Sequence, residues 1–104
     1  MRIAVFGAGA VGAQIALRLT QAGYPTSVIA RGKHLQAIVE NGLTLETPDG
    51  VTTCRLEATS DSRSLGVQDV VVVALKGTAL AAAVPDIHPL VGEHTRVMYA
   101  MNGL

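Results

Sequence analysis

Residues 3–12 constrain the fold of this chain more than any other stretch. Ile3 to Phe6 form a continuous apolar, β-prone run, which is typical of a strand buried on both faces of a parallel sheet. Gly7, Gly9 and Gly12 follow directly with the spacing G-x-G-x-x-G. In such a turn the first glycine permits a tight bend and the second lets the backbone approach a pyrophosphate. The third glycine lets the next helix pack closely against the strand.

This pattern predicts a strand, a phosphate-binding turn and a helix, with the phosphates on the free N–H groups at the helix N-terminus. A glycine-spaced turn alone is weak evidence, because a plain strand-to-helix turn can use its glycines for packing only. The strand before the turn and the helix after it favour the dinucleotide-binding interpretation. The residues expected to contact the dinucleotide here are Gly7, Ala8, Gly9, Ala10, Val11 and Gly12.

The helix after the turn is expected to end near Gly23, a residue suited to the position just past a helix C-terminus. Pro25 then prevents the helix from resuming. Apolar residues recur at helical spacing and predict one stripe, which consists of Val11, Ile15, Leu19 and Ala22.

The residue after the second predicted strand bears on the choice of cofactor. Thr26 to Ala30 form that strand, and Arg31 stands at its C-terminal end. NAD sites place an acidic residue near this point for the adenosine ribose, whereas NADP sites place an arginine near the 2′-phosphate. No acidic residue lies between Gly12 and Glu40, and Lys33 offers a second positive charge. The pattern favours NADP(H), the alternative being an arginine that only faces solvent at a helix start.

The composition agrees with one α/β domain. The chain has 104 residues, of which 49% are hydrophobic and only 3% aromatic, so its core must be aliphatic. Eight Lys plus Arg balance eight Asp plus Glu, which gives no electrostatic reason to expect a nucleic acid or an anionic membrane as a partner. No apolar run is long enough to span a bilayer and no signal-peptide pattern is present, so a cytoplasmic protein is expected.

Cysteine and histidine usage predicts no metal site. Cys54 is the single cysteine, so an internal disulfide is excluded, and its simplest role is that of a small apolar strand residue. The three histidines have no mutual spacing that suggests a shared metal ion.

The middle of the chain predicts a second helix and a hairpin. Gly32 to Asn41 carries apolar residues at helical spacing and ends in an Asn-Gly stop signal. Leu43 to Thr47 alternates, a Pro-Asp-Gly turn follows, and Val51 to Ala58 resumes strand character. The apolar parity shifts within this last segment, which indicates either a bulge or a change of strand from the hairpin to the main sheet. Ser60 to Ser62 is expected to be a turn or a helix cap.

The C-terminal third predicts two further strands. Val70 to Leu75 is strongly β-branched and should be buried, and Arg96 to Ala100 should be the last strand. Between them, Ala79 to Val84 is expected to be a short helix that Pro85 interrupts. A sheet that ends with this fifth strand would leave an edge and an apolar face open.

The expected fold class is therefore a Rossmann-like, doubly wound α/β domain over residues 1–104, with a mainly parallel sheet and a hairpin insertion. Ligands of such sheets sit beyond the carboxyl ends of the strands. One rim should therefore carry the glycine turn, Arg31, Lys76 and Asn102. Taken singly, Lys76 is equally compatible with a solvent-facing lysine, and Asn102-Gly103 with an ordinary tight turn.

Over essentially the whole chain, these residues resemble the N-terminal domain of the ketopantoate reductase (2-dehydropantoate 2-reductase) family. The resemblance implies an NADPH-dependent oxidoreductase that reduces 2-dehydropantoate to pantoate in pantothenate and coenzyme A synthesis. The segments that carry it are Gly7 to Gly12, Ala30-Arg31, the hairpin from Gly42 to Gly50, Ala74-Leu75-Lys76 and Asn102-Gly103.

The resemblance also implies roles for single residues. Leu75, Lys76 and Asn102 would complete the cofactor-binding set, with Lys76 and Asn102 at the nicotinamide end. The Lys76 ammonium would favour an anionic 2-keto acid, and the Asn102 amide would hydrogen-bond the substrate or the nicotinamide ribose. Ala79 stands where family members often carry a glutamine that contacts the cofactor, so that contact is missing here.

The family has a second, helical domain that supplies a catalytic lysine and a substrate-binding glutamate, and this chain stops at Leu104 before either. The 104-residue chain is therefore expected to bind NADP(H) weakly and to show no turnover alone. The intact protein is expected to be the active form and is compatible with a homodimer.

Two alternatives remain open from the sequence. The chain could be the cofactor domain of another hydroxyacid dehydrogenase, or a nucleotide-sensing regulatory domain that is not an enzyme. Sensor domains usually carry an acidic residue at the second strand end, where this chain has Arg31. A preference for NADH over NADPH would favour the sensor.

Overall fold

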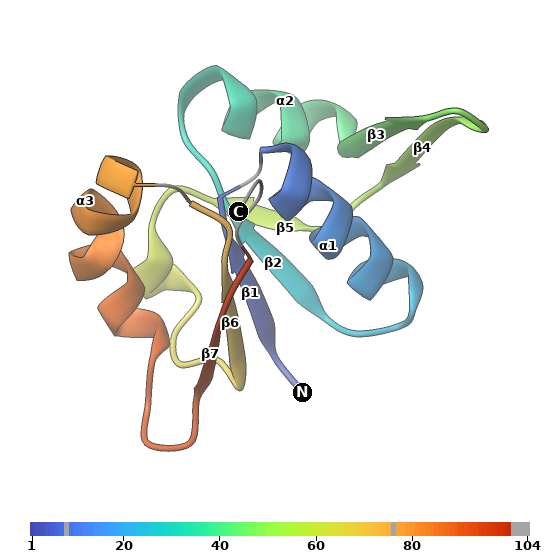
Figure 1. Ribbon diagram of the computed structural model, residues 1–104. Coiled ribbons are helices and arrows are strands. Elements are labelled where there is room, and N and C mark those ends of the chain that lie inside the picture. Colours follow the sequence, from blue (N-terminus) through green and yellow to red (C-terminus); the bar gives the residue numbers. More distant parts are fainter. Residues whose placement is uncertain (8, 76, 101–104) are drawn as a thin grey trace.

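The first strand lies at the centre of a five-stranded parallel sheet, and this placement organises the domain (Figure 1). The computed structural model describes residues 1–7, 9–75 and 77–100. The strands are β1 (Ile3–Phe6), β2 (Thr26–Ile29), β5 (Glu57–Thr59), β6 (Val70–Val73) and β7 (Arg96–Tyr99), in the sheet order β5-β2-β1-β6-β7. Ile3 pairs with Thr26 on one side and with Val70 on the other, so the two halves of the chain meet at β1.

Helices cover both faces of this sheet (Figure 1). Helices α1 (Ala10–Gln21) and α2 (Gly32–Asn41) lie on one face. Helix α3 (Gly77–Ile87) lies on the other, with the short 3₁₀ turns η1 (Ser62–Ser64) and η2 (His88–Leu90). Ile3 and Val5 point toward α1, whereas Ala4 and Phe6 point toward α3, as the two-residue period of a strand requires. This arrangement confirms the doubly wound, Rossmann-like fold class.

The hairpin insertion consists of β3 (Leu43–Thr47) and β4 (Gly50–Cys54), which pair antiparallel in a separate two-stranded sheet. The chain then leaves the hairpin, and β5 joins the main sheet beside β2. The shift in apolar parity therefore marks a change of strand, and the alternative explanation of a bulge is wrong.

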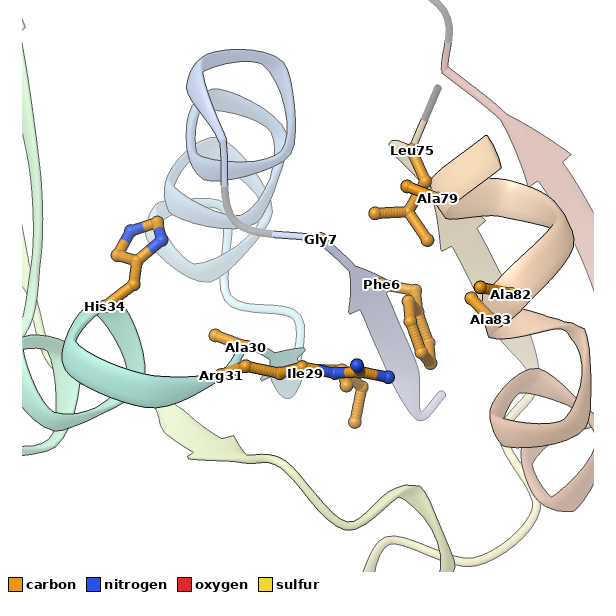
Figure 2. Close-up of a pocket in the computed structure, with 10 residues that line it drawn as sticks. All are labelled: Phe6, Gly7, Ile29, Ala30, Arg31, His34, Leu75, Ala79, Ala82 and Ala83. Carbon is orange, nitrogen blue, oxygen red and sulfur yellow. The ribbon is translucent and has the colours of Figure 1, made fainter. Parts of the chain in front are cut away.

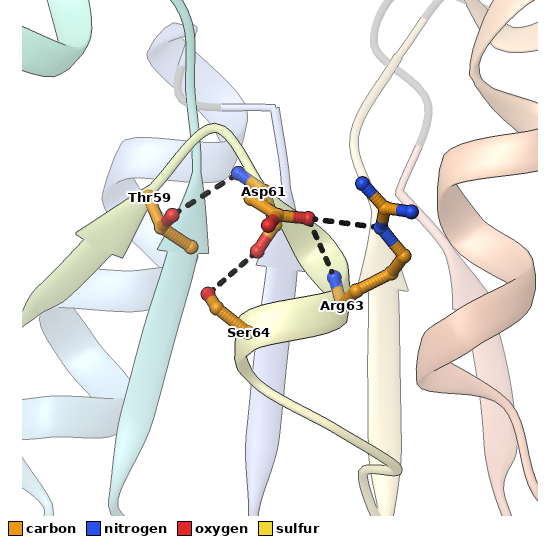
Figure 3. Close-up of polar contacts among 4 residues, drawn as sticks. All are labelled: Thr59, Asp61, Arg63 and Ser64. Atoms are coloured by element: carbon orange, nitrogen blue, oxygen red, sulfur yellow. Dashed lines mark hydrogen bonds and ion pairs between the residues drawn. The ribbon is translucent and has the colours of Figure 1, made fainter.

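The connection from β5 to β6 begins with a capped turn (Figure 3). The Asp61 carboxylate accepts a hydrogen bond of 3.1 Å from the Arg63 amide and so caps η1. The Thr59 hydroxyl accepts from the Asp61 amide at 3.0 Å, and the Ser64 hydroxyl donates to the Asp61 carbonyl at 2.7 Å. The prediction of a turn or cap at residues 60–62 is confirmed.

The prediction that Val11, Ile15, Leu19 and Ala22 form the buried face of α1 was wrong. The residues that α1 buries are Gly12, Ala13, Ala16 and Leu17, whereas Ile15 and Leu19 are only partly buried and Ala22 is exposed. Gly12, Ala13 and Ala16 face the sheet because the glycine turn holds the start of α1 very close to β1, which leaves room for a large side chain only further along the helix, at Leu17.

The predicted break at Pro85 was also wrong. Helix α3 continues through Pro85 to Ile87, and the 3₁₀ turn follows at His88–Leu90. Pro85 is exposed near the end of the helix. Because proline has no N–H, it cannot donate to the Ala81 carbonyl, and the helix loses one backbone hydrogen bond. Ala83 before Pro85 and Ile87 after it both pack against the apolar cluster on this face of the sheet, which holds the helix in place on both sides of the proline.

The last strand leaves an apolar face open, as expected. Met98 and Tyr99 are 59% and 63% exposed. They line a hollow of about 510 Å³ together with Ile15, Leu19 and Tyr24. No helix within the described residues is both long and apolar enough to cross a membrane.

Candidate nucleotide-binding site

The strand order reverses at β1, because β2 lies on one side of it and β6 on the other. In open parallel sheets the crevice beyond the carboxyl ends of the strands at such a reversal is where ligands bind. A cavity of about 350 Å³ lies at this point (Figure 2). Its walls come from the ends of β1 and β2 and from α3, and its lining residues are Phe6, Gly7, Ile29, Ala30, Arg31, His34, Leu75, Ala79, Ala82 and Ala83.

The turn between β1 and α1 is closely packed at two of its three glycines. Gly7 has a φ of 100°, and a Cβ there would lie 2.8 Å from the Ala74 carbonyl oxygen. A Cβ on Gly12 would lie only 1.9 Å from the Gly7 carbonyl oxygen. Gly9 is different, because no atom lies within 4 Å of the place where its Cβ would be. The turn therefore fits tightly against β6 and α1 but leaves open space beside Gly9.

The N-terminus of α1 opens into this space. Gly9 is the N-cap, and the helix begins with the Ala13 amide donating to the Gly9 carbonyl at 2.8 Å. Among the described residues no side chain caps this end and no acidic residue occupies its first turn. The first-turn N–H groups have no carbonyl acceptor within the helix, and together with the positive end of the helix dipole they form a cradle for an anion.

Arg31 lies on the opposite wall of the cavity. It follows β2 directly and is the N-cap of α2, so its backbone is fixed while 70% of its side-chain surface stays exposed. Figure 2 shows the side chain extending across the cavity above Ile29. Its Nη2 lies 3.0 Å from the Asp86 Oδ2 of α3.

The start of α2 is a second place suited to an anion. Its first turn holds Lys33 and His34 and no acidic residue, and no described side chain caps it. His34 lines both the cavity and a neighbouring hollow of about 450 Å³ between α1 and α2.

The structure brings together most of the site residues expected from the sequence. Gly7, Arg31 and Leu75 line the cavity, whereas Gly9 and Ala10 line the neighbouring hollow of about 450 Å³, and Val11 and Gly12 belong to the start of α1. Ala8, Lys76 and Asn102 lie outside the described residues.

The sequence interpretation missed several residues of the cavity. Phe6 and Ile29 end β1 and β2, and Ala30 directly follows β2, which ends one residue before the expected Ala30; their place at the carboxyl ends of strands was the available signal. Ala79, Ala82 and Ala83 lie on one face of α3, as their spacing of three and four residues requires, and this face lines the cavity. Ala79, noted as a departure from the family pattern, does lie on the cavity wall.

Cys54 lies apart from this site, in the hairpin strand β4. Burial raises the pKa of its thiol above the usual value, which disfavours the reactive thiolate. Its place beside the core agrees with the packing role expected from the sequence.

Comparison with known proteins gives a consistent result. The family model described as ketopantoate reductase PanE/ApbA matches residues 3–104. A 2-dehydropantoate 2-reductase from Mesorhizobium japonicum is 43% identical over 105 residues, which cover 100% of this chain and 32% of that protein. A 2-dehydropantoate 2-reductase from Lactococcus lactis is 34% identical, with 100% of this chain and 34% of that protein covered.

Solved structures agree with the sequence relatives. The 2-dehydropantoate 2-reductase from Geobacter metallireducens superimposes with a TM-score of 0.90 at 32% identity, covering 100% of this chain and 35% of that one. A D-mandelate dehydrogenase, solved with NADH and anilino(oxo)acetate, has a TM-score of 0.89 at 28% identity over 100% of this chain and 34% of that one. The chain spans about a third of the length of these relatives. By its sequence, its fold and its glycine turn, the chain belongs to the ketopantoate reductase PanE/ApbA family.

Proposed function

We propose that residues 1–104 form the nucleotide-binding domain of an NADPH-dependent 2-dehydropantoate 2-reductase, an enzyme of pantothenate and coenzyme A synthesis. Family membership and the names of the relatives support this function. Bound NADPH would supply a hydride to the C2 keto carbon of 2-dehydropantoate, whose oxygen gains a proton to give pantoate. Because the relatives are about three times as long, we expect a further helical domain to supply the rest of the substrate site.

The glycine turn is proposed to hold the diphosphate. The open space at Gly9 lets phosphate oxygens approach the backbone, and the first-turn amides of α1 donate hydrogen bonds to them. The residues proposed to contact the cofactor here are Gly7, Ala8, Gly9, Ala10, Val11 and Gly12. Leu75 would lie against the cofactor from the β6 side.

Arg31 is proposed to bind the adenosine 2′-phosphate, and this residue carries the choice of NADPH. Arg31 lines the cavity next to the start of α2. The first turn of that helix has backbone N–H groups without helical acceptors, and it also carries Lys33. An exposed guanidinium forms paired, charge-assisted hydrogen bonds to a phosphate. The segment between Gly12 and Glu40 contains no carboxylate that would accept from a ribose 2′-hydroxyl in the manner of an NAD site.

Lys76 and Asn102 keep the roles that the family resemblance implies. We propose that both act at the nicotinamide end, where the Lys76 ammonium attracts the carboxylate of the 2-keto acid and the Asn102 amide orients the substrate or the ribose.

The test is a titration of the protein with NADPH and with NADH, followed by the same titrations on Arg31→Ala. The unsubstituted protein should bind NADPH more tightly. The substitution should weaken NADPH binding about 10- to 100-fold, because a charged hydrogen-bonding pair contributes about 1.5–3 kcal/mol. NADH binding should change less than about twofold, since NADH lacks the 2′-phosphate.

A preference for NADH in the unsubstituted protein would contradict the assignment of Arg31. Such a result would favour a site that takes NADH, the cofactor present in the D-mandelate dehydrogenase structure. The reaction itself is tested by following NADPH oxidation with 2-dehydropantoate. The 104-residue chain should show no turnover, and a protein of the relatives' length that contains it should be active.

A further inference from the structure

We propose that Asp86 is a specificity-determining residue at the adenosine end of the site, where its carboxylate competes with a cofactor 2′-phosphate for the guanidinium of Arg31. This inference rests on the proposed function, because it concerns the same cavity and the same arginine. It adds a residue on α3 that no sequence motif places at the cofactor.

The contact joins Arg31, which lines the cavity, to Asp86 at the end of α3, which lies just outside the cavity and borders a neighbouring hollow of about 620 Å³. Arg31 projects from the end of β2, and Asp86 belongs to the last turn of α3 on the opposite face of the sheet. The Nη2–Oδ2 distance is 3.0 Å, and the two side chains are 70% and 49% exposed. The guanidinium proposed to bind phosphate therefore already has an anionic partner, and both side chains of the pair are open to solvent.

Local stability does not account for a carboxylate at this place. A negative charge in the last turn of a helix lies at the negative end of the helix dipole, which is unfavourable. An ion pair as exposed as this one contributes little to folding. The other ion pair among the described residues joins Arg63 to Asp61, so each of these arginines has a carboxylate partner of its own.

A 2′-phosphate and the Asp86 carboxylate would seek the same donors. When NADPH binds, Arg31 must leave Asp86 or divide its N–H groups between two anions, and the carboxylate repels the phosphate at short range. NADH brings no anion to this point. Asp86 should therefore weaken NADPH binding while leaving NADH binding almost unchanged, which narrows the preference between the two cofactors.

The test compares the unsubstituted protein with Asp86→Asn, Arg31→Ala and the double variant, each titrated with NADPH and with NADH at low salt. Asp86→Asn keeps the shape and removes the charge. It should tighten NADPH binding about fivefold and change NADH binding less than about twofold, as expected for a screened surface charge. In the Arg31→Ala background the same substitution should have a clearly smaller effect, because the contested partner is gone.

Glu93→Gln is the matched control, since it removes one exposed carboxylate from the loop before β7, at the opposite edge of the sheet. It should leave both affinities unchanged, and far-ultraviolet circular dichroism should show that every variant is folded. Unchanged or weaker NADPH binding by Asp86→Asn would overturn the inference while the proposed function stands. Absence of NADPH binding by the unsubstituted protein would overturn both.

Discussion

At the scale of single residues, the three glycines of the turn serve different purposes. The closeness of Gly12 to the Gly7 carbonyl and of Gly7 to Ala74 is a packing requirement that exists without any ligand. Gly9 has no neighbour to avoid, so its missing side chain matters only when something occupies the space beside it. Fold and binding can therefore be separated by substitution within one short turn.

Gly12→Ala should destabilise the fold. Its methyl group would overlap the Gly7 carbonyl oxygen at 1.9 Å, and relief requires α1 to move away from β1. We expect the free energy of unfolding to fall by about 1–3 kcal/mol, the usual cost of overpacking, measured by urea denaturation.

Gly9→Ala is the matched control within the same turn. Alanine is a poorer N-cap than glycine, but the backbone there, with a φ of −69°, suits alanine and the unfolded chain loses freedom, so the two effects offset and stability should change by less than about 0.5 kcal/mol. NADPH binding should nevertheless weaken. Equal stability of the two variants would show that the turn is looser than its geometry indicates.

At the scale of elements, α3 contains a proline, Pro85, that lowers the stability of the helix. Pro85 is exposed, so it contributes no buried contact, yet it lacks the N–H that would donate to the Ala81 carbonyl. Pro85→Ala should raise the free energy of unfolding by about 1 kcal/mol. This is less than the full propensity difference of about 3 kcal/mol, because the position is near the helix end and the unfolded chain gains freedom.

Thermal and urea denaturation would measure this gain. Val84→Ala, at the neighbouring exposed position, is the control and should change stability by no more than about 0.5 kcal/mol. A loss of stability on replacing Pro85 would mean that restriction of the unfolded chain outweighs the missing hydrogen bond.

Elements with local signals could be predicted from the sequence, and long-range relations could not. The bounds of α2 follow from periodicity and the Asn41-Gly42 stop, and β1 from its apolar run. The buried face of α1 was misjudged because hydrophobicity ranks Ile15 above Ala16, whereas the tight turn selects small side chains. The position of Arg31 at the end of a strand could be predicted from the sequence. Its ion pair with Asp86 could not, because the two residues are far apart in the chain and meet only in the folded domain.

At the scale of the whole molecule, two apolar clusters hold the helical layers on the sheet. The cluster on the α3 face contains Leu90, which is fully buried although it belongs to a short 3₁₀ turn. The Leu90 carbonyl also accepts a hydrogen bond of 2.9 Å from the Gln68 amide, so this turn joins the loop before β6. Stability of the second face thus depends on a segment outside the regular helices.

Leu90→Ala should reduce the free energy of unfolding by about 2–5 kcal/mol, since it removes a fully buried side chain and leaves a cavity. That is a large share of the roughly 5–15 kcal/mol typical of a domain. The adjacent Val91 is 38% exposed, and Val91→Ala should cost less than about 1 kcal/mol. Similar losses for the two variants in chemical denaturation would show that η2 is not anchored through Leu90.

The central position of β1 has a consequence for how the chain is made. Because β1 is synthesised before both of its neighbours, it can pair with β2 early, but its other edge stays unpaired until β6 has emerged. Throughout that interval Ile3–Phe6 offer apolar surface and unsatisfied backbone groups to any other nascent strand. Slow translation between β2 and β6 should therefore increase aggregation of the newborn protein, and a holdase chaperone at the tunnel exit should suppress it.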